Sequence, residues 1–150
     1  MSDHIINTKL KLPCGVSLKN RLVKSAMTER ISNLKFEPTA GHDRLYEEWS
    51  ETGAGLLITG NVMIDRIHLE SAGNVCFDDE NMIPKLKSWA NAGKKYGNHI
   101  WVQISHAGRQ ANKFSTLRPL IRYADYEKIN YEATVRLFEI AKEQRVKQFI

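Results

Sequence analysis

Three short apolar runs alternate with two segments of helical periodicity, and this alternation limits the folds open to the chain more than any other feature. The runs, at residues 21–26, 55–62 and 100–104, are predicted as buried strands, because strands covered on both faces read as nearly continuous apolar sequence. The segments 42–52 and 80–96 carry apolar residues at spacings of three and four, as amphipathic helices do. Such alternation predicts an α/β fold with parallel strands and right-handed crossovers.

A short antiparallel hairpin is expected before the first of these strands. Residues 9–12 alternate polar and apolar side chains, Pro13-Cys14-Gly15 is a turn signal, and residues 16–18 can form the returning strand. We predict that this hairpin forms an N-terminal cap.

Polar residues follow the predicted strands, at the end where parallel α/β folds bind ligands. Thr28 follows the first strand, and its hydroxyl suits either a ligand contact or a turn. Gly60 stands between Thr59 and Asn61 near the end of the second strand, where a glycine admits either a planar ligand or a closely packed neighbour. The sequence leaves both alternatives open at each position.

The segment Trp101–Gln110, WVQISHAGRQ, begins as an apolar strand and ends in a polar cluster. Gln103 is the unusual residue, because a carboxamide in a buried strand needs partners for its donors and its acceptor. Either a ligand with a complementary edge or neighbouring protein groups supply them. Gly108 and Arg109 follow as a flexible turn and a cationic fork, and among the histidines we expect only His106 at this face.

Residues 64–74 form a polar excursion after the second predicted strand. It contains Asp65, Arg66, His68 and Glu70, but their spacing matches no metal-ligand pattern. We predict a solvated hairpin here and no metal site.

The composition is that of an ordinary globular protein, with 42% hydrophobic and 26% charged residues. The net charge of +5 is spread without a basic block, so no nucleic-acid partner is expected. Two cysteines without metal or disulfide spacing favour the reducing cytoplasm. No apolar stretch reaches the roughly 20 residues that cross a bilayer, and the N-terminus lacks a signal-peptide core, so no membrane association is expected.

Three stretches, residues 12–29, 53–65 and 101–111, resemble in order and spacing the old yellow enzyme family, in its NADH:flavin oxidoreductase branch. The resemblance covers residues 1–119. It implies a partial (β/α)8 TIM barrel made of the first three to four β/α units behind an N-terminal β-hairpin cap. It also implies FMN as cofactor, NAD(P)H as reductant and a small-molecule substrate, an activated alkene.

The resemblance assigns cofactor binding to residues at the ends of the three strands: Ser25, Ala26, Met27, Thr28, Gly60 and Gln103. Residues 25–28 would lie along the isoalloxazine, with Thr28 near the flavin C4 oxygen, although many members have proline where Ala26 stands. Gly60 would lie beside the flavin and Gln103 would pair with its pyrimidine edge. His106 and Arg109 would shape the site.

No catalytic residue is assigned. In the family, the His/His or His/Asn pair that binds the substrate carbonyl, the proton-donating tyrosine and the phosphate-binding loops follow this region, and a full barrel takes about 250 residues. We therefore expect an N-terminal part of an oxidoreductase that is inactive alone. The alternative is a non-catalytic partial barrel that self-associates through its exposed sheet edge; visible flavin absorption would separate the two.

Residues 120–150 stand apart as a predicted helix, 123–144, followed by a strand-like run, 146–150. Residues 130–150 resemble the helix and strand of an extended short-chain dehydrogenase, which implies, as a further alternative, a fragment of an NAD(P)-binding protein. The alternative is that these residues form the third helix and fourth strand of the barrel. Against it, the family normally has a long loop between its third strand and third helix, and only about a dozen residues are available here. We predict a boundary at 119/120, arising from truncation, gene fusion or sequence error.

Overall fold

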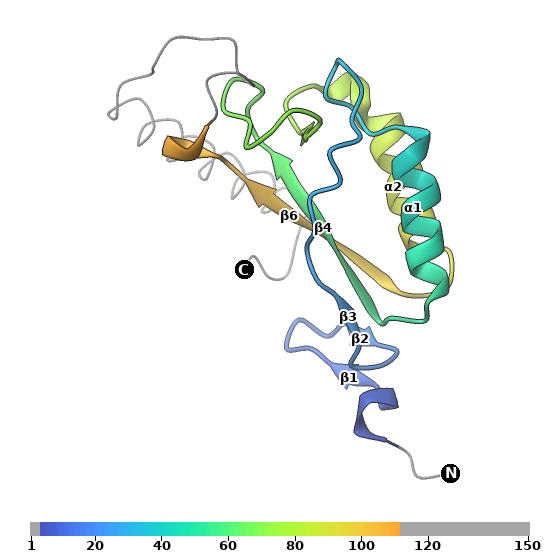
Figure 1. Ribbon diagram of the computed structural model, residues 1–150. Coiled ribbons are helices and arrows are strands. Elements are labelled where there is room, and N and C mark those ends of the chain that lie inside the picture. The colour runs from blue at the N-terminus through green and yellow to red at the C-terminus, as the bar shows by residue number, and fades with distance from the viewer. Residues whose placement is uncertain (1–3, 112–150) are drawn as a thin grey trace.

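The computed structural model describes residues 4–111, and Figure 1 shows a small twisted sheet with two helices packed on one side of it. In chain order the elements are η1 (Ile5–Asn7), β1 (Leu10–Lys11), β2 (Ser17–Leu18), β3 (Val23–Lys24), α1 (Ala40–Glu51), β4 (Leu56–Met63), β5 (Val75–Cys76), η2 (Glu80–Met82), α2 (Ile83–Lys94), β6 (His99–Ser105) and η3 (Gly108–Gln110).

The predicted hairpin is confirmed. β1 pairs antiparallel with β2, with Leu10 opposite Leu18. Gly15 has a φ of +89° and closes the turn by donating its N–H to the Leu12 carbonyl at 2.9 Å, a conformation that favours glycine.

The predicted parallel strands are also confirmed, with β4 at the centre. β3 pairs parallel with β4, with Val23 opposite Leu56, and β6 pairs parallel on the other side, with Leu56 opposite His99. A register shift falls between Ile58 and Asn61. The two-residue strand β5, which the sequence did not predict, also pairs parallel with the end of β4.

The core lies between β4 and the two helices. Its buried residues are Tyr46, Ala54, Leu57, Val62, Val75 and Trp89. The rings of Tyr46 and Trp89 meet nearly perpendicular, with centroids 5.2 Å apart. Aromatic pairs in this edge-to-face geometry add to the gain from burial alone, and this pair ties α1 to α2.

Both predicted helices are present, with ends fixed by local hydrogen bonds. Thr39 and His42 form a reciprocal capping box at the start of α1, and Gly53, at a φ of +87°, follows its last turn. Asp79 caps the turn η2 by accepting the Asn81 N–H, and α2 continues from it.

The predicted burial of β3 and β6 on both faces is wrong. Val23 is 47% exposed, and Trp101, Val102 and Ile104 of β6 are each about 40% exposed. Right-handed crossovers place α1 and α2 on the same side of the sheet (Figure 1). Within residues 4–111 the opposite face therefore lacks a covering layer.

The predicted solvated hairpin at residues 64–74 is also wrong. His68, Leu69 and Asn74 are at most 2% exposed, and Leu69 packs with Met63 and Cys76 in a second apolar cluster. The segment is an irregular loop folded onto the end of β4. The predicted helix 123–144 and strand 146–150 lie outside the described residues.

Candidate functional site

Thr28, Gly60 and Gln103, which were predicted to meet at the strand ends, are brought together around β4. The Thr28 hydroxyl accepts the Asn61 N–H at 3.5 Å, and the Gln103 N–H donates to the Thr59 hydroxyl at 2.9 Å. The three predicted residues therefore lie together near the carboxyl ends of the strands, although they are far apart in sequence.

Gly60 is required by the close passage of the segment that follows β3. A Cβ placed on Gly60 would lie 2.3 Å from the Met27 carbonyl oxygen and 2.5 Å from the Thr28 Cα. These contacts are far shorter than side chains tolerate, so close packing accounts for the glycine without a ligand. Of the two alternatives left open by the sequence, the packing reading has direct geometric support.

A chain of hydrogen bonds runs from Gln103 into the loop after β4. The Gln103 Nε2 donates to Asn61 Oδ1 at 2.6 Å, and Asn61 Nδ2 donates to Glu70 Oε2 at 3.2 Å. The same carboxylate oxygen accepts Asn74 Nδ2 at 3.3 Å and the Thr28 hydroxyl at 3.5 Å. Glu70 thus accepts a hydrogen bond from Thr28 directly and is connected to Gln103 through Asn61.

Glu70 remains charged in this setting. Partial burial alone would raise its pKa, but the hydrogen bonds from Asn61 and Asn74, together with the Arg30 guanidinium 3.6 Å away, outweigh that effect and leave the pKa below its ordinary value.

A second carboxylate, Glu29, connects the end of β3 to β4 and α1. Its Oε1 accepts the Gly60 N–H at 3.2 Å and the Tyr46 hydroxyl, and lies 3.9 Å from Lys24 Nζ. The Lys24 ammonium also sits 3.8 Å above the Trp49 ring, a cation–π contact. Burial lowers the pKa of Lys24, against the opposing charge of Glu29, and burial together with Glu29 raises that of Tyr46.

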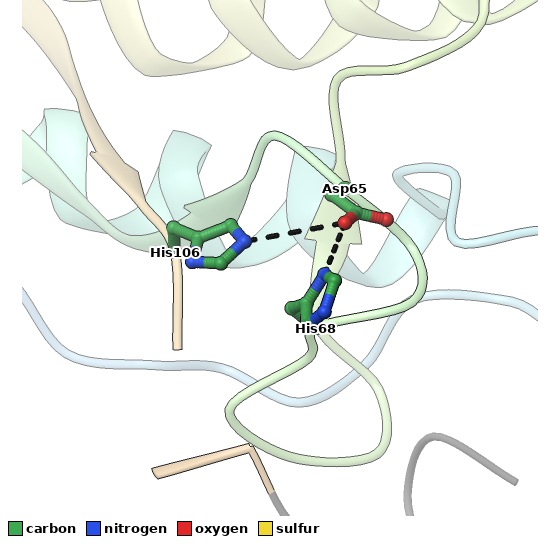
Figure 2. Close-up of side chains that lie close together, drawn as sticks. All are labelled: Asp65, His68 and His106. Carbon is green, nitrogen blue, oxygen red and sulfur yellow. Dashed lines mark hydrogen bonds and ion pairs between the residues drawn. The ribbon is translucent and has the colours of Figure 1, made fainter. Parts of the chain in front are cut away.

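A third carboxylate, Asp65, lies between two histidines, as Figure 2 shows. His68 Nδ1 is hydrogen-bonded to Asp65 Oδ2, and His106 Nε2 lies 4.0 Å from the same oxygen. The two imidazole rings are 4.8 Å apart. The expectation that only His106 lies at this face is therefore wrong, because the loop after β4 folds back and brings His68 beside it.

Two imidazoles and a carboxylate are suitable metal ligands. The hydrogen bonds of this cluster instead favour a structural role, in which Asp65, His68 and His106 hold the loops after β4 and β6 together; we call this cluster the clasp. Gly108 donates its N–H to His106 Nδ1 at 3.1 Å, so the proton of a neutral ring belongs on Nε2, the atom that faces Asp65. A metal ion there would have to displace both this arrangement and the bond from His68. Burial, and secondarily His68, lowers the pKa of His106, with Asp65 opposing the shift.

The remaining predicted site residues lie around this edge. Ser25 and Met27 are exposed, Ala26 is half-buried, and Arg109 is exposed in η3. The sequence did not identify Asn61, Glu70 or Asp65 as partners. The only signal of Asp65 and Glu70 was a polar excursion after a strand, which is also typical of solvated loops, and Asn61 was noted only as a polar neighbour of Gly60.

The family model of the NADH:flavin oxidoreductase / NADH oxidase family matches residues 10–150 of this chain. The chain belongs to this family. The match includes residues 120–150, and the comparisons give no support to a short-chain dehydrogenase fragment there.

Curated relatives in the NADH:flavin oxidoreductase family are longer than this chain. The NADH-dependent flavin oxidoreductase iccE of Talaromyces variabilis is 35% identical over 115 residues, covering 74% of this chain and 28% of the relative. The enzyme iliE of Hypocrea jecorina is 35% identical over 114 residues, covering 73% and 28%. The chain thus spans a little over a quarter of the length of these relatives.

Solved structures agree on the fold. Morphinone reductase in complex with tetrahydroNAD matches with a TM-score of 0.66 at 20% identity, covering 76% of this chain and 30% of that one. The old yellow enzyme homologue from Zymomonas mobilis matches at 0.69 and 17% identity, covering 77% and 32%. The described residues thus have the fold of the N-terminal part of the old yellow enzyme TIM barrels. The NADH:flavin oxidoreductase / NADH oxidase family uses FMN and NAD(P)H. Within residues 4–111 no helix has the length and apolar character to cross a membrane.

Proposed function

We propose that this chain supplies the part of an FMN site that faces the flavin pyrimidine ring, within an NAD(P)H-dependent flavin oxidoreductase of the ene-reductase type. The observation that carries the proposal is the convergence of Thr28 and Gln103 around Asn61 at the carboxyl ends of parallel strands, where Gly60 lets the Thr28 segment pass close to β4. Ligands of α/β barrels bind at this end.

The residues present fit a planar heterocycle with an imide edge. Gln103 is exposed, and among residues 4–111 its carbonyl oxygen accepts no hydrogen bond, while one Nε2 proton goes to Asn61. A carbonyl beside an N–H complements an N–H beside a carbonyl, which is what the pyrimidine edge of a flavin offers. Thr28 would contact the region of the C4 oxygen, and the backbone of 25–28 would lie along the ring.

FMN, when bound, supplies hydride transfer from NAD(P)H to an activated alkene, and the protein orients the ring and tunes its electronics. In this chain, the orienting groups are the Gln103 carboxamide and the Thr28 hydroxyl. His106 and Arg109 shape the loop that follows β6. Two free cysteines support a cytoplasmic location, and the division at 119/120 stays a prediction.

A flavin titration of the purified chain tests the proposal. Lumiflavin, which lacks the phosphate, should bind weakly and about as well as FMN, because the proposed contacts are all to the ring. Gln103→Ala should weaken both by about tenfold, the value of one or two ligand hydrogen bonds, whereas Gln110→Ala in η3 should leave binding unchanged.

Two results would contradict this. Tight, stoichiometric FMN binding would mean that the chain holds the phosphate itself, and no lumiflavin binding in any variant would remove the pyrimidine-edge assignment. With FMN and NADPH added, we expect no reduction of cyclohexenone beyond that given by free reduced FMN.

A non-catalytic, self-associating partial barrel is the second candidate. It is supported by the exposed apolar side chains on β6, Trp101, Val102 and Ile104, because an open sheet edge with apolar surface favours pairing with another copy. Sedimentation of the colourless protein as a dimer that Trp101→Lys converts to monomer would favour this candidate. A monomer that binds lumiflavin would exclude it.

A further inference from the structure

We propose that Glu70 sets the hydrogen-bond polarity of Gln103 through Asn61, so that Gln103 presents its carbonyl oxygen to an N–H donor of the ligand. This makes Glu70 a positioning residue for a planar ring whose edge carries an imide N–H. The inference rests on the proposed flavin function for the identity of the ligand, but the polarity itself is a property of the chain alone.

The argument starts from the chemistry of a carboxylate, which only accepts hydrogen bonds. Because Glu70 Oε2 lies 3.2 Å from the Asn61 amide, the Asn61 NH₂ group must face Glu70 and its Oδ1 must face the other way. An Oδ1 oxygen can only accept, so the Gln103 NH₂ group must face Asn61, at 2.6 Å. The orientation of two amides, which electron density alone rarely settles, follows here from one charge.

The position of Glu70 is fixed independently of Gln103. Asn74 is 1% exposed and donates to the same Oε2 at 3.3 Å, while its own Oδ1 accepts the Ser71 N–H at 2.7 Å. Arg30 lies 3.6 Å from the other oxygen, Oε1. The carboxylate thus has a buried donor on one side and a cation on the other, and it does not need the ligand to hold it in place.

Glu70, Asn61 and Gln103 form a hydrogen-bond relay. Its consequence concerns Gln103, the exposed end of this relay. With its NH₂ group directed to Asn61, Gln103 keeps its Oε1 and one N–H for a ligand. A reversed carboxamide would place its N–H groups against the imide N–H and lose that bond. The relay therefore selects rings that donate at this position over rings in which the same nitrogen is alkylated.

The test compares lumiflavin with 3-methyllumiflavin and follows the Gln103 side-chain amide by NMR. The variant Glu70→Gln keeps the shape but has only one acceptor oxygen, which Asn74 favours on the side of Asn61 and Arg30 favours on the opposite side, so it no longer fixes the amides. The double variant Glu70→Gln/Asn61→Asp moves an acceptor-only carboxylate next to Gln103 and should restore its orientation. Glu48→Gln, an exposed carboxylate on α1 paired with Arg44, is the matched control.

In the wild type, one Gln103 Nε2 proton should be shifted downfield by its bond to Asn61, and lumiflavin should be preferred about tenfold over its 3-methyl analogue. Glu70→Gln should move the proton upfield and reduce the preference towards one. The double variant should recover both, and the control should change neither. A role of Glu70 in folding alone would not produce recovery in the double variant.

The relay is refuted if Glu70→Gln leaves both the Gln103 proton and the preference unchanged, or if the double variant recovers neither. If Glu70→Gln does not fold, Asn61→Leu gives the same test, because it cuts the relay while Glu70 keeps Asn74 and Arg30. If lumiflavin does not bind the wild type, the proposed function fails, and the proton shift alone decides whether the relay exists.

Discussion

The substitution Gly60→Ala tests the close packing on which the strand-end site depends. The added methyl group would meet the Met27 carbonyl oxygen at 2.3 Å and the Thr28 Cα at 2.5 Å. Both are backbone atoms that cannot rotate away, so the segment after β3 must shift, and overpacking of this kind costs about 1–3 kcal/mol. Reduced freedom of the unfolded chain returns only about 0.4–1 kcal/mol. The two ranges give a net loss between about 0 and 2.6 kcal/mol, and we expect a value near its middle, about 1.3 kcal/mol.

The loss is measured by urea unfolding followed by circular dichroism, where it should lower the midpoint by about 1 M for a chain with an m-value of about 1–2 kcal/mol/M. Gly41→Ala is the control: Gly41 is helical and exposed, and its nearest contacts, at 3.3 Å, are to the side-chain tips of Ile31 and Thr39. This control should be neutral or stabilising, because alanine is the better helix former. Equal midpoints for Gly60→Ala and the wild type would refute the reasoning, since the segment after β3 could not then lie against β4.

Three further predictions concern the buried carboxylates and histidines. Tyr46→Phe should lower the free energy of unfolding by about 1.5–3 kcal/mol, because Glu29 loses a donor; unchanged urea stability would argue against that bond. Asp65→Asn should speed hydrogen exchange at the Ile64 and Ala107 amides, which join the loops after β4 and β6, and unchanged exchange would remove the clasp. Burial lowers the pKa of His42 and His106 below 6.5, so below that pH the unfolded chain binds more protons and stability should fall with decreasing pH, by at most about 1.4 kcal/mol per unit for each histidine; stability that is flat from pH 7 to 5 in urea titrations would contradict this.

The helices and parallel strands could be predicted because their signals are local. Leu86 and Trp89 of the apolar stripe lie on the core side of α2, and the structure places Asp79 as the cap of η2 and Gly53 after the last turn of α1. Tyr96 extends the same stripe but is 44% exposed, because α2 ends at Lys94. The apolar periodicity of the sequence thus continues past Lys94, whereas the end of α2 is defined by its local hydrogen bonds.

The partners within the site could not be predicted, because they come from a loop without periodicity. Gln103 was noticed as a carboxamide that needs partners, but its partner Asn61 was read as one of two polar neighbours of a glycine. His68 was assigned to a solvated hairpin, since a histidine among polar residues gives no sign of burial. Its burial depends on Leu69 packing onto Met63 and Cys76, which is a tertiary contact.

The carboxylates of Glu29, Asp65 and Glu70 have different roles at the strand ends. Glu29 fixes the distance between the β3 segment and β4 through Gly60, and Asp65 lies between the histidines of the loops after β4 and β6. Glu70 contributes less to the spacing of the strand ends, because the hydrogen bond that it orients, between Asn61 and Gln103, ends on an exposed side chain. Substitution of Glu29 should therefore lower stability, whereas substitution of Glu70 should change which ring the site accepts, at a smaller cost in stability. This separation arises because Glu29 is 7% and Glu70 30% exposed at the side chain, and a bond lost nearer to water is partly replaced by solvent.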